Sequence, residues 1–269
     1  MKKLMILVAA LIVLIPSLAY SDMMTVRLGY YMPSILNSYN YLSHLNSLWG
    51  IELSQMSFGP SDFRGAMLGG GYEFFLTKQF SVALSVDGYT REAGGYYRDY
   101  VAVTLNNADF QGDYAFPAAN YTGDFEVLHS FHVSMTPVQL SLKLAPLGRK
   151  TRIIPYVGGG VGLYFISASI RGSIVDFSSP SLVNDPDRPE LGNFNIYPVV
   201  PAQLHETQEV IGGHAFAGLM IPIGYRVTLE GEARYHFVTV KFHHAFPYPD
   251  FDTFDLSGLS LSIGLNYWF

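Results

Sequence analysis

The chain contains no cysteine and little charge. The absence of cysteine excludes a disulfide framework and a lipid anchor attached to a cysteine. Only 14% of the residues are charged, and the net charge of −6 comes without a basic cluster, which argues against nucleic acid as a partner. After the first 15 residues the chain also lacks a long apolar run, because glycines, serines and charges interrupt every apolar stretch. A membrane-spanning helix is therefore not expected in the main part of the chain.

The N-terminal segment has the layout of a secretory signal peptide. Two lysines precede an apolar run over residues 4–15, and a proline and small residues follow it. The run is short for a spanning helix, so an uncleaved anchor is the less favoured alternative. We predict cleavage after Ala19 or Ser21, which assigns residues 1–21 to the signal peptide and residues 22–269 to one mature domain.

Aromatic residues are plentiful, at 15%, and they occur where apolar and polar residues alternate. In GLSLSIGLNYWF, residues 258–269, every odd position is apolar, and every even position except Trp268 is small or polar. This period of two predicts a strand with two different environments on its faces. Eleven residues at roughly 3.3 Å each, tilted about 40°, span roughly 28 Å, which covers the apolar band of an outer-membrane barrel. In a closed barrel this strand has to pair with residues 26–32, so that no sheet edge remains in hydrocarbon.

Seven further segments repeat this alternation: TVRLGYYM, GAMLGGGYEFFL, FSVALSVDG, VQLSLKL, PYVGGGVGLYF, HAFAGLMIPIGY and RVTLEGEARYHFV. Short joins at residues 77–79, 145–152 and 225–226 alternate with long ones at about 33–64, 88–127, 171–212 and 242–255. This sorting of connections predicts an all-β fold, an eight-stranded antiparallel up-and-down transmembrane β-barrel with long outer loops and short periplasmic turns.

The alternation, the segment PYVGGGVGLYF and the end LSIGLNYWF together resemble the small bacterial outer-membrane β-barrel family, which includes OmpA-like and OmpW-like barrels. The resemblance covers essentially the whole mature chain, and any OmpA likeness is confined to the membrane part. It implies a place in the outer membrane of a Gram-negative bacterium, in contact with outer-membrane lipid, and no cofactor. It also implies that Leu265, Tyr267 and Phe269 form the signal that the outer-membrane assembly machinery reads.

Several charged or polar residues fall on the register that faces the lumen: Arg27, Glu73, Asp87, Lys143, Glu230, Glu232, Arg234 and His236. Isolated charges in a narrow lumen would be costly, so these groups should pair or hydrogen-bond. The interior of an eight-stranded barrel is about wide enough to be filled by its own side chains. We therefore predict a polar network that blocks the lumen, with a narrow porin-like conduit for small solutes as the alternative.

Ahead of Val138 the apolar register changes parity, because Phe131, Val133 and Met135 are the apolar residues there. We predict a β-bulge at Thr136-Pro137, which would absorb the change and tolerate the proline. This phase turns the three apolar side chains towards lipid.

The segment LHSFHVS contains His132 and Ser134, which resemble the histidine-serine pair of PagL-like lipid A deacylases. A hydroxyl with an adjacent base can act as a nucleophile. With the predicted bulge, however, both side chains face the lumen, whereas an enzyme that cuts acyl chains needs them outside. We therefore expect no enzyme, and an outer-membrane lipid A-modifying enzyme is the third interpretation.

The remaining candidates for chemistry are weaker. His205, His214, His243 and His244 are interpreted as solvated or interfacial, because adjacent histidines on a strand point to opposite faces and ligate one metal poorly. The glycines at 158–160 have no following lysine-serine pair or helix, so they form no phosphate cradle. They are expected to permit close packing against lumen side chains.

The long outer loops are where an extracellular ligand would bind. Residues 88–127 are rich in aromatic residues, and residues 171–212 are rich in proline and are predicted to be irregular. Apolar residues recur at helical spacing over residues 35–49 and predict a short amphipathic helix. The chain is thus predicted to have a structural or surface-interaction role.

Overall fold

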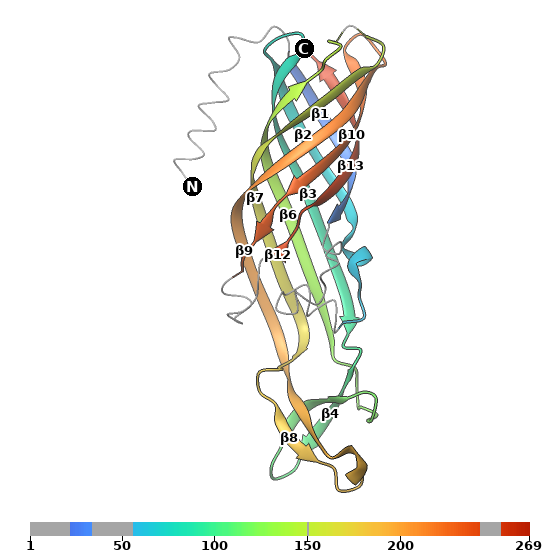
Figure 1. Cartoon of the computed structure of the whole chain (residues 1–269), viewed down its shortest axis with the longest axis vertical. Coiled ribbons are helices and arrows are strands. Elements are labelled where there is room, and N and C mark those ends of the chain that lie inside the picture. Colours follow the sequence, from blue (N-terminus) through green and yellow to red (C-terminus); the bar gives the residue numbers. More distant parts are fainter. Residues whose placement is uncertain (1–21, 34–55, 150, 243–253) are drawn as a thin grey trace.

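The computed structural model describes residues 22–33, 56–149, 151–242 and 254–269, which form an almost entirely β structure (Figure 1). Within these ranges no helix is long and apolar enough to cross a membrane. The predicted signal peptide and the helix predicted over residues 35–49 lie outside the described residues. The elements are β1 (Asp22–Pro33), η2 (Pro60–Phe63), β2 (Gly65–Phe75), β3 (Phe80–Tyr96), β4 (Tyr100–Asn106), β5 (Gln111–Pro117), β6 (Leu128–Leu144), β7 (Ile154–Val175), β8 (Ser181–Asn184), η3 (Pro189–Leu191), β9 (Asn193–Pro222), β10 (Val227–Phe237), β11 (Thr239–Val240), β12 (Phe254–Asp255) and β13 (Gly258–Trp268).

Eight strands close into an antiparallel ring in the order β1, β2, β3, β6, β7, β9, β10 and β13. The last strand returns to the first, with pairs that run from Met23↔Trp268 to Pro33↔Gly258. This confirms the predicted barrel and the predicted partner of the terminal strand. The closure leaves no strand edge in the ring, as hydrocarbon requires.

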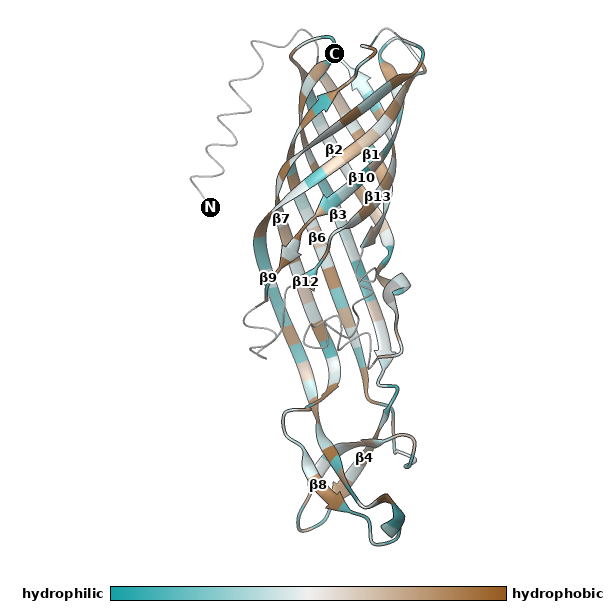
Figure 2. Cartoon of the chain, viewed as in Figure 1, coloured by the Kyte–Doolittle hydropathy of each residue, from teal (hydrophilic) through white to brown (hydrophobic). Residues whose placement is uncertain are grey.

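Large apolar side chains are exposed on the outside of all eight strands. Leu28, Leu142 and Ile263, for example, have exposed fractions of 62%, 63% and 67%. The side chains between them point inwards and are largely polar, and this alternation can be followed along the ribbons in Figure 2. A continuous apolar belt around a closed barrel fits lipid and would be unfavourable in water. The ring is therefore a transmembrane barrel.

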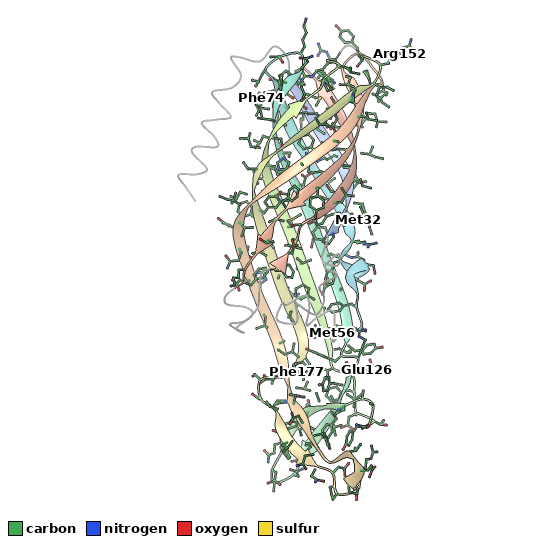
Figure 3. The ribbon with its side chains drawn as sticks, in the orientation of Figure 1. Met32, Met56, Phe74, Glu126, Arg152 and Phe177 are labelled. Carbon is green, nitrogen blue, oxygen red and sulfur yellow. The ribbon has the colours of Figure 1, made fainter. Side chains whose placement is uncertain are left out.

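The eight strands differ greatly in length. β1, β2, β10 and β13 have 12, 11, 11 and 11 residues, whereas β3, β6, β7 and β9 have 17, 17, 22 and 30. The four long strands continue past the others, away from the end that carries the short turns (Figure 1). In Figure 3, Phe74 and Arg152 lie at this short-turn end, and Met56 and Phe177 lie on the far side of Met32. We call the parts of β3, β6, β7 and β9 that continue past the ends of β1, β2, β10 and β13 the extension.

The predicted bulge in β6 is wrong. The pairing of β6 with β7 runs unbroken from His129↔Gly172 to Leu144↔Val157. Every odd residue from 129 to 145 is buried, so Phe131, Val133 and Met135 face the interior, not lipid. The register of β6 stays the same along its length, and the environment on each face of the strand changes. Near the short turns the strand has lipid outside and a polar lumen inside, whereas in the extension it has a polar outer face and an apolar core.

Beyond the extension lies a distal cap, formed by residues 97–127 and 175–203 (Figure 1). The cap is a small sheet in which β4 pairs with β5, and the start of β9 pairs with β5 and β8. The rings of Tyr100, Phe177 and Tyr197 pack edge to face, with centroids 5.0–5.8 Å apart. Much of residues 88–127 and 171–212 is thus strand, not irregular loop. The alternation in the sequence did not indicate these parts of the long strands, because the apolar register of the extension has the opposite parity to that of the belt.

The unbroken register of β6 can be tested with neighbouring substitutions. We expect Val133→Asp to destabilise the barrel by about 3–5 kcal/mol, because it leaves an unpaired charge in an apolar core. Ser134→Asp, one residue further on and facing outwards, should change stability by no more than about 0.5 kcal/mol. The measurement is the unfolding temperature, which is detected by the mobility of the folded barrel on unheated gels. A larger loss of stability for Ser134→Asp than for Val133→Asp would contradict the unbroken register and support the predicted bulge.

Candidate functional site

The inner face of the barrel carries a layer of charged side chains near the level of the belt. Every residue predicted for the lumen lies on this face, on β1, β2, β3, β6 or β10. The charged members expose only 4–11% of their side chains, and His236 is fully buried. Three strands, β1, β3 and β10, thus supply one group of charges, and β2, β6 and β10 supply another.

The first group contains Arg27, Asp87, Glu232 and Arg234. The guanidinium of Arg27 donates two hydrogen bonds to the Asp87 carboxylate, at 2.8 Å from Nε and 2.6 Å from Nη2. Arg234 lies 2.9 Å from Glu232 and 3.8 Å from Asp87. Arg27 also lies 3.6 Å from Glu232, so each arginine contacts both carboxylates. The bidentate contact between Arg27 and Asp87 fixes geometry as well as charge.

The second group lies around Lys143, whose ammonium is 3.0 Å from Glu73 and 3.5 Å from Glu230. Arg149, in the turn between β6 and β7, lies 3.7 Å from Glu73. Burial lowers the pKa of Arg149 to about 10, an effect that Glu73 opposes, so the side chain stays charged at neutral pH. This arginine was not among the predicted residues, because it lies in a turn outside the alternating segments.

Tyr156 joins the two groups. Its hydroxyl donates to Glu230 of the second group and lies 3.1 Å from Glu232 of the first. The ammonium of Lys143 also lies 3.7 Å from the centroid of the Tyr156 ring. Tyr156 was not among the predicted lumen residues, since a single tyrosine beside glycines gives no signal of a charge contact.

The charges in the layer balance. Arg27, Lys143, Arg149 and Arg234 contribute four positive charges, and Glu73, Asp87, Glu230 and Glu232 contribute four negative ones. Buried ions have a large desolvation cost, which only close pairing and further hydrogen bonds offset. Removing one member therefore leaves its partners buried with less compensation.

A neutral hydrogen-bonded rim adjoins the charges. Arg234 donates to the Gln139 side chain, whose amide nitrogen lies 2.9 Å from the hydroxyl of Tyr164. His236 lies 3.3 Å from that hydroxyl and 3.3 Å from the hydroxyl of Ser260. His236 thus belongs to the rim and not to the ion pairs.

His214 was interpreted as solvated or interfacial, and that interpretation is wrong. Its ring is 4% exposed, lies 2.7 Å from the Ser141 hydroxyl, and stacks on Phe216 with centroids 5.9 Å apart. The even residues of β9 face the interior, which places His214 in the lumen. His205 faces outwards and is exposed, and His243 and His244 lie outside the described residues. No group of metal-ligating side chains is found in the described part of the chain.

Apolar clusters pack inside the barrel on both sides of the charged layer. At the short-turn end, Phe75 and Trp268 stack with centroids 5.1 Å apart and pack with Met23, Ile154 and Met220. Towards the cap, a larger core contains Tyr31, Phe63, Phe131, Tyr164 and Phe254. Cavities bordered by the charged groups have volumes of about 10 and 30 Å³. Such volumes admit one or two water molecules.

Two glycine positions make room for this packing. A methyl group at Gly69 would overlap the carboxylate of Asp87, and one at Gly158 would overlap the ring of Phe216. Gly158 therefore has the packing role predicted for the glycines at 158–160.

The orientation predicted for His132 and Ser134 is wrong, as the unbroken register of β6 requires. Both side chains lie on the outer face of the extension. The nitrogen Nε2 of His132 lies 2.9 Å from the hydroxyl of Thr90 on β3, so its hydrogen bond goes to a neighbouring strand. Orientation is therefore no longer an objection to the enzyme interpretation.

The charged layer can be tested by removing its central cation. We expect Lys143→Met to lower the free energy of unfolding by about 3–5 kcal/mol, because Glu73 and Glu230 lose a close partner. Adding Glu230→Gln should recover part of the loss. Lys78→Met is the matched control, since Lys78 is exposed in the turn before β3, and it should change stability by no more than about 0.5 kcal/mol. Equal effects of Lys143→Met and Lys78→Met would show that the layer contributes nothing.

No family model and no curated protein matches this chain. Solved structures do resemble it. The outer membrane protein OprG from Pseudomonas aeruginosa is 11% identical with a TM-score of 0.46, and the match covers 93% of this chain and 97% of OprG. A major outer membrane protein from Thermus thermophilus is 13% identical with a TM-score of 0.45, over 92% and 99% of the chains. The E. coli outer membrane protein W is 13% identical with a TM-score of 0.39, over 93% and 98%. The barrel architecture of this chain rests on its own strand pairing and apolar belt.

Proposed function

We propose that this chain is an outer-membrane β-barrel with a closed lumen, whose role is structural and whose distal cap makes contacts at the cell surface. The observation that carries the proposal is the balanced layer of buried charges between two apolar clusters. A conduit needs a continuous aqueous path. The cavities beside the charges have volumes of only about 10 and 30 Å³, room for one or two water molecules, which favours a closed barrel.

The distal cap supports the surface role. It contains nine acidic residues and two basic ones and so has a net charge of −7, whereas the whole chain has a net charge of −6. The cap thus carries the negative charge of the molecule on a small sheet with an aromatic core. A partner of the cap would be cationic, because complementary charge steers association.

Two other functions can each be tested by one measurement. A narrow conduit would appear as steady conductance in a bilayer. A lipid A-modifying enzyme would change the mass of lipid A in the host, and Ser134→Ala would abolish the change.

Conductance is the direct test of the closed lumen. We expect the wild-type barrel in planar bilayers to give no steady current. The variant Asp87→Ala/Arg234→Ala removes one charge of each sign from the layer and should give short openings, since it hollows the layer without changing net charge. A large and steady wild-type current would overturn the proposal.

The terminal strand is proposed to be the assembly signal. Leu265, Tyr267 and Phe269 all face outwards, with Phe269 60% exposed, whereas Trp268 faces inwards and stacks on Phe75. Deletion of Phe269 should reduce the amount of folded barrel in the membrane of cells several-fold and leave refolding in detergent nearly intact. Trp268→Ala should do the reverse, lowering the unfolding temperature with little effect on assembly. Equal folded yields in cells for the deletion and the wild type would contradict the proposal.

A further inference from the structure

The outer face of the extension carries an ordered polar surface directly beyond the lipid belt. The last apolar row of the belt on the four long strands is Val86, Val138, Leu163 and Ile211, which are paired neighbours across β3, β6, β7 and β9. The row after it contains both apolar and polar residues. The next row consists only of hydroxyl side chains: Thr90, Ser134, Ser167 and Thr207, which are again paired neighbours. We call these four residues the hydroxyl row.

The hydroxyl row is held in place by the next row outwards, on the side away from the apolar belt. That row contains Glu92, His132 and His205, which are at least partly exposed, and Ser169, which is buried. The imidazole of His132 lies 2.9 Å from the hydroxyl of Thr90, and that of His205 lies 3.5 Å from the hydroxyl of Thr207. The two ends of the hydroxyl row are therefore oriented by histidines.

The position of the row fits the zone of lipid headgroups. Thr90 is four residues beyond Val86, which is roughly 13 Å along a strand and roughly 10 Å along the membrane normal at a tilt of about 40°. Adjacent strands are about 4.8 Å apart, so four hydroxyls extend over roughly 14 Å. Because the strands are tilted, the hydroxyl row runs obliquely to the membrane plane. One end of it lies nearer the membrane interface than the other.

The chemistry of this surface is that of saccharide recognition. A hydroxyl both donates and accepts hydrogen bonds, as sugar hydroxyls do. One row further out, Arg171 is exposed between Ser130 and Gln203, and a guanidinium there can bind a phosphate or carboxylate on a sugar. A lipid with a bare phosphate headgroup would favour a row of cations in place of neutral hydroxyls.

We propose that the hydroxyl row, together with Glu92, His132 and His205 of the next row outwards, binds the core saccharide of lipopolysaccharide in the surrounding outer leaflet. The surface is continuous with the lipid-facing belt on the same strands, so a lipid seated against the belt places its headgroup here. This inference rests on the proposed location in the outer membrane.

The test compares the unfolding temperature of the full chain in three kinds of vesicle. These contain phospholipid alone, phospholipid with lipid A, and phospholipid with a rough lipopolysaccharide that carries core sugars. We expect the wild type to gain several degrees with rough lipopolysaccharide beyond its gain with lipid A. The variant Thr90→Val/Ser134→Ala/Ser167→Ala/Thr207→Val should lose at least half of that extra gain and match the wild type in phospholipid alone.

The control is Thr122→Ala/Ser179→Ala, which removes two exposed hydroxyls from the distal cap and should keep the full gain. If the fourfold variant folds poorly, Ser134→Ala/Ser167→Ala serves in its place. Equal gains with lipid A and rough lipopolysaccharide would overturn the inference, as would a full gain in the variants. Failure of the proposed location is a separate outcome, since the wild type would then be missing from the outer-membrane fraction of cells.

Discussion

The structure depends on one constraint, that hydrocarbon offers no partner to a backbone N–H or C=O group. The chain meets it by pairing its last strand with its first, over the pairs from Met23↔Trp268 to Pro33↔Gly258. Closing the ring with eight strands makes the interior narrow. Side chains on the inner face are then brought together from all sides, and their charges have to be balanced within the lumen.

The balanced layer is the consequence. Arg27 on the first strand, Asp87 on the third and Arg234 near the end of the chain meet in one group. Lys143 and Glu230 meet in the other, and Tyr156 links the two. Since removal of one partner leaves a buried charge uncompensated, the layer joins distant parts of the sequence into one cooperative unit.

The same strands serve two solvents. Within the membrane they present Leu140 and Leu142 to lipid and Gln139 and Lys143 to the lumen. In the extension the outside is polar and the inside becomes an apolar core, without any shift in register. With this exchange β3, β6, β7 and β9 continue beyond the apolar belt and carry the acidic cap at their far end (Figure 1).

The period of two in the sequence determined the eight strands of the ring, the lipid-facing residues of the belt and the register of the terminal strand, because a belt in lipid requires an apolar residue at every second position. It also selected seven charged residues that meet in the lumen. Only the tertiary structure decided the orientation of Phe131, Val133 and Met135. A local pattern reports that the two faces of a strand differ, and it does not report which solvent lies on which face. Arg149, Tyr156 and the partner of His132 were likewise decided by which strands are neighbours in the closed ring.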